Sequence, residues 1–483
     1  MNPEEINVAN HFEKSKYKLL LLKLVHLVLS VALFYIFWLL FRYHTLWGMN
    51  KYGFRYNYFI AFGYGVLLYW FNRIYNAYLL GYNRIRALVF GQFFSQFFAV
   101  VLIYLMVSVG WNQLRAPWIF FSLLALQLVL DVVWSYLGTK YFFKLIPRRK
   151  TLLIYRNQLD RTRFGNMGGK PTERLYQVTD EIQYDGPFSG LEEHLSGYDA
   201  VFVAGVNSRC RNGILKYCKT NGIPGFFLPH VGDTIMREAQ HVKSFDSPVL
   251  YVNRTVLNPE YAIIKRAFDI VSSAAALILL SPVMLITGLA IHFYDGGPAF
   301  YKQARLTKDG KEFKILKFRS MRVDAEKDGV ARLSTGKNDD RITPIGRFIR
   351  KCRIDEIPQL WNIFKGEMSV VGPRPERPEL TEAYSEIMPD FKLRLQVKAG
   401  LTGYAQVYGK YNTDPYEKLE FDLLYINSMN ILTDLQLCFA TFGILFLPES
   451  TEGVAAGQTT AMDYENEENR TGKREKRDEH WAD

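Results

Sequence analysis

Arg350-Lys351-Cys352-Arg353-Ile354-Asp355-Glu356-Ile357-Pro358-Gln359-Leu360-Trp361-Asn362 is the stretch that says most about how this chain folds. Asp355 and Glu356 follow a basic cluster and are expected to open a helix, because Pro358 suits a first helical turn. At a helix start both carboxylates can face one ligand, and free N–H groups there favour phosphate. The alternative is that Asp355 caps the helix and Glu356 is a solvated first-turn acid.

Many cations surround this acidic pair in the sequence. The run Lys314–Met321 alternates like a strand and carries three cations, and further cations lead into the pair: Arg341, Arg347, Arg350, Lys351 and Arg353. Arginine binds phosphate oxygens in pairs, and Mg²⁺ takes one or two carboxylates plus substrate phosphates. The pattern predicts a diphosphate site with a bridging Mg²⁺, where an aspartate can attack phosphorus. For any single cation, a solvated or headgroup-facing position is the alternative.

The first third of the chain holds four apolar segments of membrane-spanning length. They run over Leu19–Phe41, Tyr56–Leu80, Ala87–Trp111 and Pro117–Phe143. Lysine and arginine are more frequent before the first segment, between the second and third, and after the fourth. This bias predicts a four-helix transmembrane bundle with both ends in the cytoplasm. Asp131 lies in the fourth segment, where a charge either serves a function or pairs inside the bundle.

A less apolar region follows, from Thr151 to about Val252. Short buried strands are expected at Thr151–Tyr155, Ala200–Ala204 and Gly225–Leu228, with a helix over Asn212–Thr220. This order indicates an α/β, nucleotide-fold-like module. Because the first strand leads into Arg156–Asp160 rather than into G-x-G-x-x-G, we expect no dinucleotide binding.

A fifth apolar stretch, Ile270–Tyr294, has cations on both sides, which suggests that both of its ends are cytoplasmic. Ser281-Pro282 lies at its middle. Proline kinks a helix, and a neighbouring serine hydroxyl can bond a freed carbonyl. We therefore expect a re-entrant membrane helix that breaks at Pro282. The alternative is an ordinary kinked span, which would put the rest of the chain outside.

Composition narrows the partners. The net charge of +11 over 483 residues favours nucleic acid, lipid headgroups or phosphorylated substrates. No lysine–arginine stripe is interleaved with base-stacking aromatics, so no nucleic acid partner is expected. The four cysteines lack metal-ligand or disulfide spacing, which suits a reducing compartment. The first apolar run is too long for a cleavable signal peptide.

Several ordered motifs resemble those of the bacterial sugar transferase family, the monotopic polyprenyl-phosphate phosphoglycosyl transferases. They are Phe313–Met321, Asn338–Met368, Gly372–Pro375 and Gly400–Gly409. The catalytic resemblance covers about Ile263 to Phe446. The preceding spans and module resemble the long-form members, such as undecaprenyl-phosphate glucose or galactose phosphotransferases.

This resemblance implies a two-step reaction. Asp355 would attack the sugar-bearing β-phosphorus of a UDP-sugar and release UMP, and undecaprenyl phosphate would then accept the phosphosugar. Asp355 and Glu356 would hold Mg²⁺. Ser281 and Pro282 match the helix break of the family, and Lys265 and Arg266 match its headgroup anchor. The predicted substrate-binding residues are Lys317, Arg319, Arg341, Arg350 and Arg374.

The chain departs from the family pattern near the predicted nucleotide and sugar pocket. Arg353 stands where serine is common, and Lys398-Ala399-Gly400 replaces a basic-Pro-Gly run. Tyr404 and Tyr408 stand where tryptophan and asparagine are common. These changes bear on substrate identity more than on reaction type. Two further acids match family positions, with capping or ion pairing as the alternative: Asp422 and Asp434.

The predicted architecture is a mixed membrane protein. Its parts are a transmembrane domain (1–146), a Rossmann-like cytosolic module (147–255), a re-entrant helix (256–297), a small α/β catalytic domain (298–448) and a disordered tail (449–483). The expected location is the bacterial inner membrane, with the catalytic domain on the cytoplasmic face, among membrane lipids. A homodimer is one expected assembly. The expected role is to start exopolysaccharide, capsule or O-antigen synthesis.

Two other functions stay open from the sequence. One is a non-catalytic membrane scaffold that recruits later glycan enzymes. The other is a glycosyltransferase that extends an existing lipid-linked chain and releases UDP instead of UMP.

Overall fold

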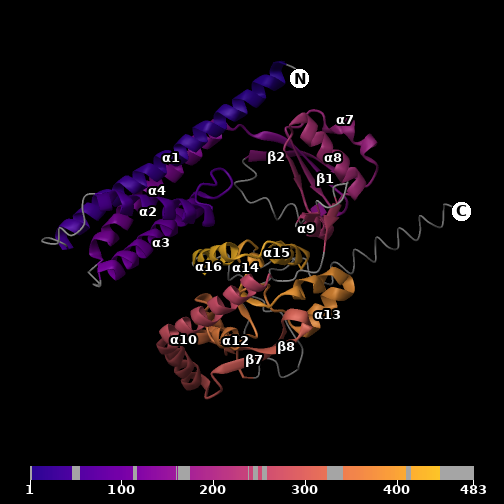
Figure 1. Ribbon diagram of the computed structural model, residues 1–483. Coiled ribbons are helices and arrows are strands. Elements are labelled where there is room, and N and C mark those ends of the chain that lie inside the picture. Colours follow the sequence, from indigo (N-terminus) through magenta and orange to yellow (C-terminus); the bar gives the residue numbers. More distant parts are fainter. Residues whose placement is uncertain are drawn as a thin grey trace. The chain divides into compact units, whose positions relative to one another are not determined.

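A computed structural model gives the structure of residues 3–45, 55–111, 117–158, 160–161, 175–237, 239–242, 249–252, 258–323, 341–409 and 415–445. The chain divides into two compact units, residues 1–228 and 229–483, and each is described by itself (Figure 1). The tail predicted at 449–483 lies outside the described residues.

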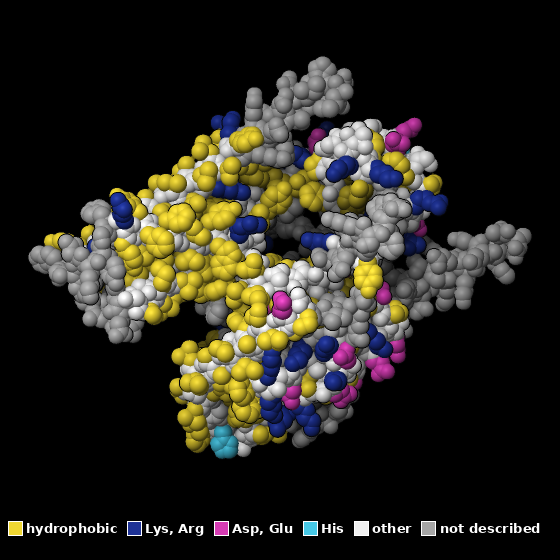
Figure 2. All heavy atoms as spheres, in the orientation of Figure 1, with side chains coloured by type: hydrophobic (Ala, Val, Ile, Leu, Met, Phe, Trp, Pro, Cys, Tyr) yellow, Lys and Arg dark blue, Asp and Glu magenta, His cyan; other side chains and the backbone are white. Residues whose placement is uncertain are grey.

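The first unit begins with four apolar helices, as predicted. They are α1 (Pro3–Thr45), α2 (Arg55–Ile74), α3 (Ile85–Trp111) and α4 (Trp118–Leu145). Hydrophobic side chains cover much of their visible surface (Figure 2). By length and hydropathy, the helices of the described residues that can cross a membrane are α1, α3, α4 and, in the second unit, α10 (Pro259–Asp295). The protein is therefore a membrane protein.

The end predicted for the second apolar segment was wrong. The prediction continued to Leu80, but α2 ends at Ile74. Asn76 then has a left-handed backbone, with φ of 50°, which an α-helix does not accommodate. The residues that follow form turns until α3 begins at Ile85.

Asp131 pairs inside the bundle. Its Oδ1 accepts a hydrogen bond from Gln96 Nε2 at 2.9 Å and lies 3.0 Å from His26 Nε2. The other ring nitrogen of His26 lies 2.9 Å from the hydroxyl of Tyr78. Both Asp131 and His26 are fully buried. A polar network therefore ties α1, α3 and α4 together, as the second interpretation of Asp131 proposed.

A parallel four-stranded sheet follows the bundle, in the order β2-β1-β3-β4. Its strands are β1 (Arg149–Tyr155), β2 (Tyr176–Gln183), β3 (Ala200–Ala204) and β4 (Gly225–Phe227), with short helices η1 (Phe188–Gly190) and α7 (Glu192–Leu195) and the longer α8 (Ser208–Asn221). Three strands and α8 agree with the predicted α/β module. The edge strand β2 was missed, because most of its side chains are polar and exposed.

The two faces of this sheet have different coverings. Leu153 and Phe202 pack in one hydrophobic cluster with Leu80 and Phe142 of the bundle region. Leu152 and Val201 point to the opposite face and pack with Ile214 of α8. Period-two alternation along β1 and β3 thus joins bundle and module into one unit. The absence of dinucleotide binding stays a prediction.

Among its described residues, the second unit has three two-stranded sheets, the long helix α10 and several shorter helices. The hairpin of β7 (Phe300–Leu306) and β8 (Glu312–Phe318) is antiparallel, and β9 (Ser369–Val371) pairs in parallel with β10 (Gly400–Thr402). The remaining elements are α9 (Val231–Arg237), β5 (Gln240–Val242), β6 (Val249–Tyr251), η2 (Lys308–Gly310), α11 (Pro344–Lys351), η4 (Ile354–Glu356), α12 (Gln359–Lys365), α13 (Pro378–Ile387), η5 (Pro389–Gln396), α14 (Tyr404–Val407), α15 (Pro415–Asn427) and α16 (Ile431–Leu445).

The helix α10 is tied to the rest of this unit near both ends. Close to its start, Asp269 Oδ1 accepts hydrogen bonds from Ser369 Oγ at 3.0 Å and from Val370 N at 2.9 Å. Close to its end, Ile291 packs in one cluster with Phe318. A straight helix of 37 residues would span about 55 Å, against about 30 Å for a bilayer core. Figure 1 shows α10 changing direction partway along.

We predict that Asp131→Leu lowers the thermal stability of the detergent-solubilised protein more than Asp131→Asn does. Leucine leaves the buried polar atoms of His26 and Gln96 unpaired, at about 1–3 kcal/mol for each group. Asparagine keeps an oxygen acceptor in place. The measurement is thermal unfolding followed by tryptophan fluorescence. Val132→Leu, at an exposed position of α4, is the control, and equal melting temperatures for all variants would contradict the structural role.

Candidate active site

The acidic pair lies on a short 3₁₀ turn. Asp355 and Glu356 belong to η4, and α12 begins only at Gln359, so the pair precedes the α-helix instead of opening it. Neither element has a side-chain hydrogen bond at its N-cap, which removes the capping interpretation of Asp355. Arg353 starts the turn with a left-handed φ of 56°. This backbone costs about 1–2 kcal/mol for a non-glycine residue, so the surrounding contacts must hold it.

Three cations surround Glu356. Arg374 Nη2 donates to Glu356 Oε1 at 2.7 Å, and Lys317 Nζ lies 3.4 Å from the same oxygen. Arg353 Nη1 lies 3.7 Å from Oε2. Burial alone would raise the pKa of Glu356, but these positive charges hold it well below its usual range. Glu356 is therefore ionised at any physiological pH.

Asp355 has a different environment. Its Oδ1 is buried and has no hydrogen-bond partner among the residues that the structure describes. Burial, and then the charge of Glu356, raise its pKa from 3.8 to about 6, against the opposing effect of Lys317, Arg350 and Arg353. Neighbouring carboxyls whose pKa values are driven apart are typical of catalytic pairs. At neutral pH, Asp355 is a partly desolvated anion with an oxygen available for reaction.

Arg374 is held in place by a second buried ion cluster. Arg394 Nη2 donates to the backbone carbonyl of Arg374 at 2.9 Å and lies 2.6 Å from Asp422 Oδ2. Arg394 Nη1 lies 3.7 Å from Glu376 Oε1, and Arg305 Nη1 approaches the same carboxylate at 3.7 Å. Asp422 is thus an ion-pairing residue, as its alternative interpretation stated. The cluster fixes the backbone that carries the Arg374 guanidinium to Glu356.

The structure distributes the predicted substrate-binding residues over two places. Lys317, Arg350 and Arg374 act on the acidic pair. Arg319 instead forms an ion pair with Asp295, at the end of α10. Arg341 lies before α11, where its carbonyl accepts a hydrogen bond from Arg322 N at 2.9 Å. The roles assigned to all five stay predictions.

The predicted anchor and helix-break residues lie along α10. Lys265 Nζ donates to Asp434 Oδ2 at 2.7 Å, and Arg266 donates to the carbonyls of Ile363 and Phe364, both at 2.8 Å. Ser281 Oγ donates to the carbonyl of Ile278 at 2.8 Å, as expected beside Pro282, which lies inside the helix. Both Lys265 and Arg266 thus bind groups of their own unit. Their contact with lipid headgroups stays a prediction.

Sequence reasoning did not assign Arg353, Arg305 and Arg394 to the site. Arg353 was noticed as one of the cations that lead into the acidic pair and as a departure from the family pattern, but it was not among the predicted substrate-binding residues; its guanidinium contacts Glu356. Its position two residues before the pair could have suggested this contact. Arg305 and Arg394 lie 50 and 39 residues from Asp355, and neither carries a local signal.

Together, the fold and the site define a membrane protein with a carboxylate pair set among cations that suit phosphorylated substrates. Residues 260–448 match the family described as bacterial sugar transferase. The exopolysaccharide production protein PSS of Rhizobium leguminosarum bv. phaseoli is 41% identical over 188 residues, which are 37% of this chain and 93% of that protein. The chain belongs to the bacterial sugar transferase family.

Two longer relatives carry more informative names. The UDP-glucose:undecaprenyl-phosphate glucose-1-phosphate transferase of Klebsiella pneumoniae is 40% identical over 205 residues, 41% of this chain and 42% of the relative. The undecaprenyl-phosphate galactose phosphotransferase of Salmonella typhimurium is 36% identical over 211 residues, which are 41% of this chain and 44% of that relative. The match thus spans less than half of these two relatives.

We predict that Asp355→Asn raises the melting temperature at pH 7.5. A carboxyl whose folded pKa lies above its unfolded value stabilises the fold below the unfolded pKa, and this stability is lost as pH rises through about 6. Asparagine has no ionisable group, so the variant does not lose this stability as the pH rises. The variant should melt higher by about 2–4 °C for each kcal/mol removed, with the difference shrinking towards pH 4.5. The exposed Asp390→Asn is the control, and a pH-independent difference would contradict the assignment.

Proposed function

We propose that the protein transfers a sugar 1-phosphate from a UDP-sugar to undecaprenyl phosphate and releases UMP. The observation that carries this proposal is the buried Oδ1 of Asp355, which has no hydrogen-bond partner in the part of the chain that the structure describes, beside a Glu356 whose charge Lys317 and Arg374 balance. The family supports the reaction class, and the names of the relatives support UDP-glucose or UDP-galactose as the donor.

The reaction would proceed in two displacements. An Asp355 oxygen forms a bond to the sugar-bearing β-phosphorus of the donor, and the bond from that phosphorus to the UMP oxygen breaks, with UMP taking the electron pair. A phosphate oxygen of undecaprenyl phosphate then attacks the same phosphorus and displaces the Asp355 carboxylate. The sugar 1-phosphate is thus carried from a water-soluble donor to a membrane-borne acceptor on one side chain.

The cations around the pair would bind and orient the phosphates. Arg350 and Arg374 are suited to phosphate oxygens through paired N–H groups. Lys317 is half-buried, and burial lowers its pKa while Glu356 opposes that shift. Lys317 and Arg353 also lie near the Glu356 carboxylate. An arriving diphosphate can therefore replace Glu356 as the partner of Arg374, because Glu356 keeps two other cations and is not left as an unpaired buried charge.

We propose Mg²⁺ as the accompanying ion, held by Asp355 and Glu356. Asp355 Oδ1, which is buried and accepts no hydrogen bond from any described residue, fits such an ion. No group of three or more histidine, cysteine or acidic side chains able to hold a metal occurs among the described residues, so substrate phosphates and water would supply the remaining ligands. When bound, Mg²⁺ would neutralise charge on the diphosphate.

We further propose that the catalytic unit lies on the cytoplasmic face of the bacterial inner membrane, where it would start exopolysaccharide, capsule or O-antigen synthesis. Support comes from α10, whose start and end both pack on the same small unit. A helix tied at both ends to one domain suits re-entry better than spanning, which would separate those ends. A homodimer stays a prediction.

The first test is nucleotide release by the purified protein with undecaprenyl phosphate, Mg²⁺ and a panel of UDP-sugars. We expect UMP with one donor and its loss in Asp355→Asn, by about 10³-fold or more for a removed nucleophile. The exposed Asp390→Asn should retain full activity. UDP in place of UMP would indicate a glycosyltransferase, and no nucleotide with any donor would favour a scaffold.

We also predict a pH profile for single-turnover UMP release. The rate should fall as pH drops below about 6, because protonation of Asp355 removes the nucleophile. The positive charge of Arg350 lowers the pKa of Asp355, so Arg350→Gln should move this acid limb to higher pH. A limb that stays in place in this variant would show that another group titrates.

A further inference from the structure

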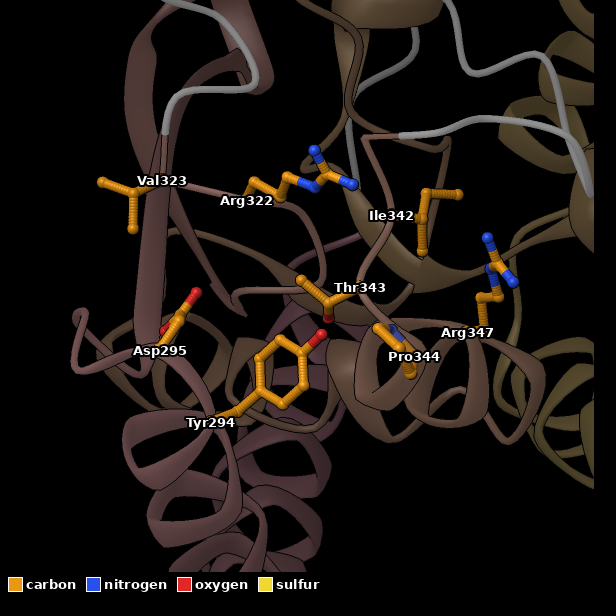
Figure 3. A pocket seen from close by; sticks show the side chains of 8 residues that line it. All are labelled: Tyr294, Asp295, Arg322, Val323, Ile342, Thr343, Pro344 and Arg347. Atoms are coloured by element: carbon orange, nitrogen blue, oxygen red, sulfur yellow. The ribbon is translucent and has the colours of Figure 1, made fainter.

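A cavity of about 540 Å³ lies at the end of α10, apart from the residues that contact Glu356. It is lined by Tyr294, Asp295, Arg322, Val323, Ile342, Thr343, Pro344 and Arg347 (Figure 3). The lining thus comes from the end of α10, the segment after β8 and the start of α11. Its volume is in the range that ligand sites usually have.

The lining carries excess positive charge. Asp295, the one acid among the eight lining residues, is already paired with Arg319. Arg322 and Arg347 are exposed and project on either side of Ile342 (Figure 3). Among the described residues of the lining, no acid other than the paired Asp295 faces these two guanidinium groups. They favour a phosphate, which each can bind through paired N–H groups.

The surroundings are also apolar. Val323 is 64% exposed, and Phe293 and Phe348, next in sequence to Tyr294 and Arg347, are 80% and 62% exposed. Along the rest of α10, Leu285 and Ile286 are exposed as well. Large apolar side chains in solvent beside cations are typical of protein that lies at a membrane interface. A ligand that suits this cavity combines a phosphate with hydrocarbon.

The cavity is connected to the acidic pair by α11. Arg347 lines the cavity, and Arg350 follows three residues later on the same helix. The carbonyl of Arg350 accepts a hydrogen bond at 3.2 Å from the N–H of Arg353, the residue that starts the turn of the acidic pair. Side chains three residues apart are neighbours on a helix surface. A phosphate at Arg347 therefore lies one helical step from a cation that acts on Asp355.

We propose that this cavity binds the phosphate of a membrane lipid and, on the basis of the proposed function, that undecaprenyl phosphate uses it to approach Asp355. Arg322 and Arg347 hold the lipid phosphate, and Tyr294, Val323 and Ile342 contact the first part of the chain. The anionic headgroup of a bulk phospholipid has the same chemistry and can occupy the site between turnovers.

The test uses the full-length protein in detergent, with Arg322→Gln, Arg347→Gln and, as the matched control, Arg209→Gln on the exposed surface of α8. Lipid binding is measured by native mass spectrometry with undecaprenyl phosphate and, separately, with phosphatidylglycerol. Kinetics give the KM of acceptor and donor, and the UMP burst without acceptor checks that the variants still fold and react with donor. We expect an acceptor KM at least about tenfold higher for each cavity variant, and a donor KM unchanged within about twofold.

The outcomes separate the two proposals. Weaker binding of undecaprenyl phosphate with a higher acceptor KM supports the site and names the acceptor as its ligand. Weaker phosphatidylglycerol binding with an unchanged acceptor KM supports the site with a bulk lipid as its ligand. Unchanged binding of both lipids, or a higher donor KM alone, overturns it. A wild-type protein without a UMP burst would instead count against the covalent route, and the binding measurements would still decide on the cavity.

Discussion

Two carboxylates on consecutive residues can stay ionised in a partly buried place only when cations compensate them. For Asp355 and Glu356, several elements of the second unit supply these cations. Lys317 comes from β8, Arg353 from the turn itself and Arg374 from the segment after β9, and all three approach Glu356. The compensation is unequal: nearby cations lower the pKa of Glu356 and hold it as an anion, whereas burial raises the pKa of Asp355 towards neutral pH. Unequal compensation gives two adjacent acids different chemical roles.

This charge arrangement explains why the unit also contains a second buried ion cluster. Arg374 can reach Glu356 only if its backbone is fixed, and Arg394 fixes it through the Arg374 carbonyl. Arg394 is itself buried, so it needs Asp422 and Glu376 as counter-charges. Each buried charge in this series requires a partner of opposite charge. The series ends at the half-buried Lys418, whose Nζ lies 3.8 Å from Glu376 Oε1. Loss of one member would leave its partners as uncompensated buried charges, the costly case for ion pairs.

Much of this organisation could be predicted from sequence, and the failures have physical causes. Apolar segments and short buried strands were readable because burial imposes a pattern on consecutive residues. The edge strand β2 has no such pattern, because most of its side chains are exposed to water and can be polar. Arg319 was predicted to bind substrate as one of the three cations of the run Lys314–Met321, and that role stays a prediction. However, β8 ends at Phe318, and Arg319 then pairs with Asp295, which a local pattern cannot reveal. Contacts such as that between Arg394 and Arg374 depend on how distant segments fold together.

In the helix α11, the packing of one of its eight residues sets where several other side chains lie. Ile349 is buried against Ile291 and Phe318, which fixes the rotation of the helix on the unit. That rotation leaves Phe348 exposed and divides its arginines, with Arg347 at the cavity and Arg350 towards Asp355. A shift of one residue along this helix would turn its side chains by about 100° and would put Phe348 or Arg350 where Ile349 now packs. The packing of a single isoleucine therefore constrains where both guanidinium groups lie, and with them the distance between the proposed lipid-phosphate site and the acidic pair.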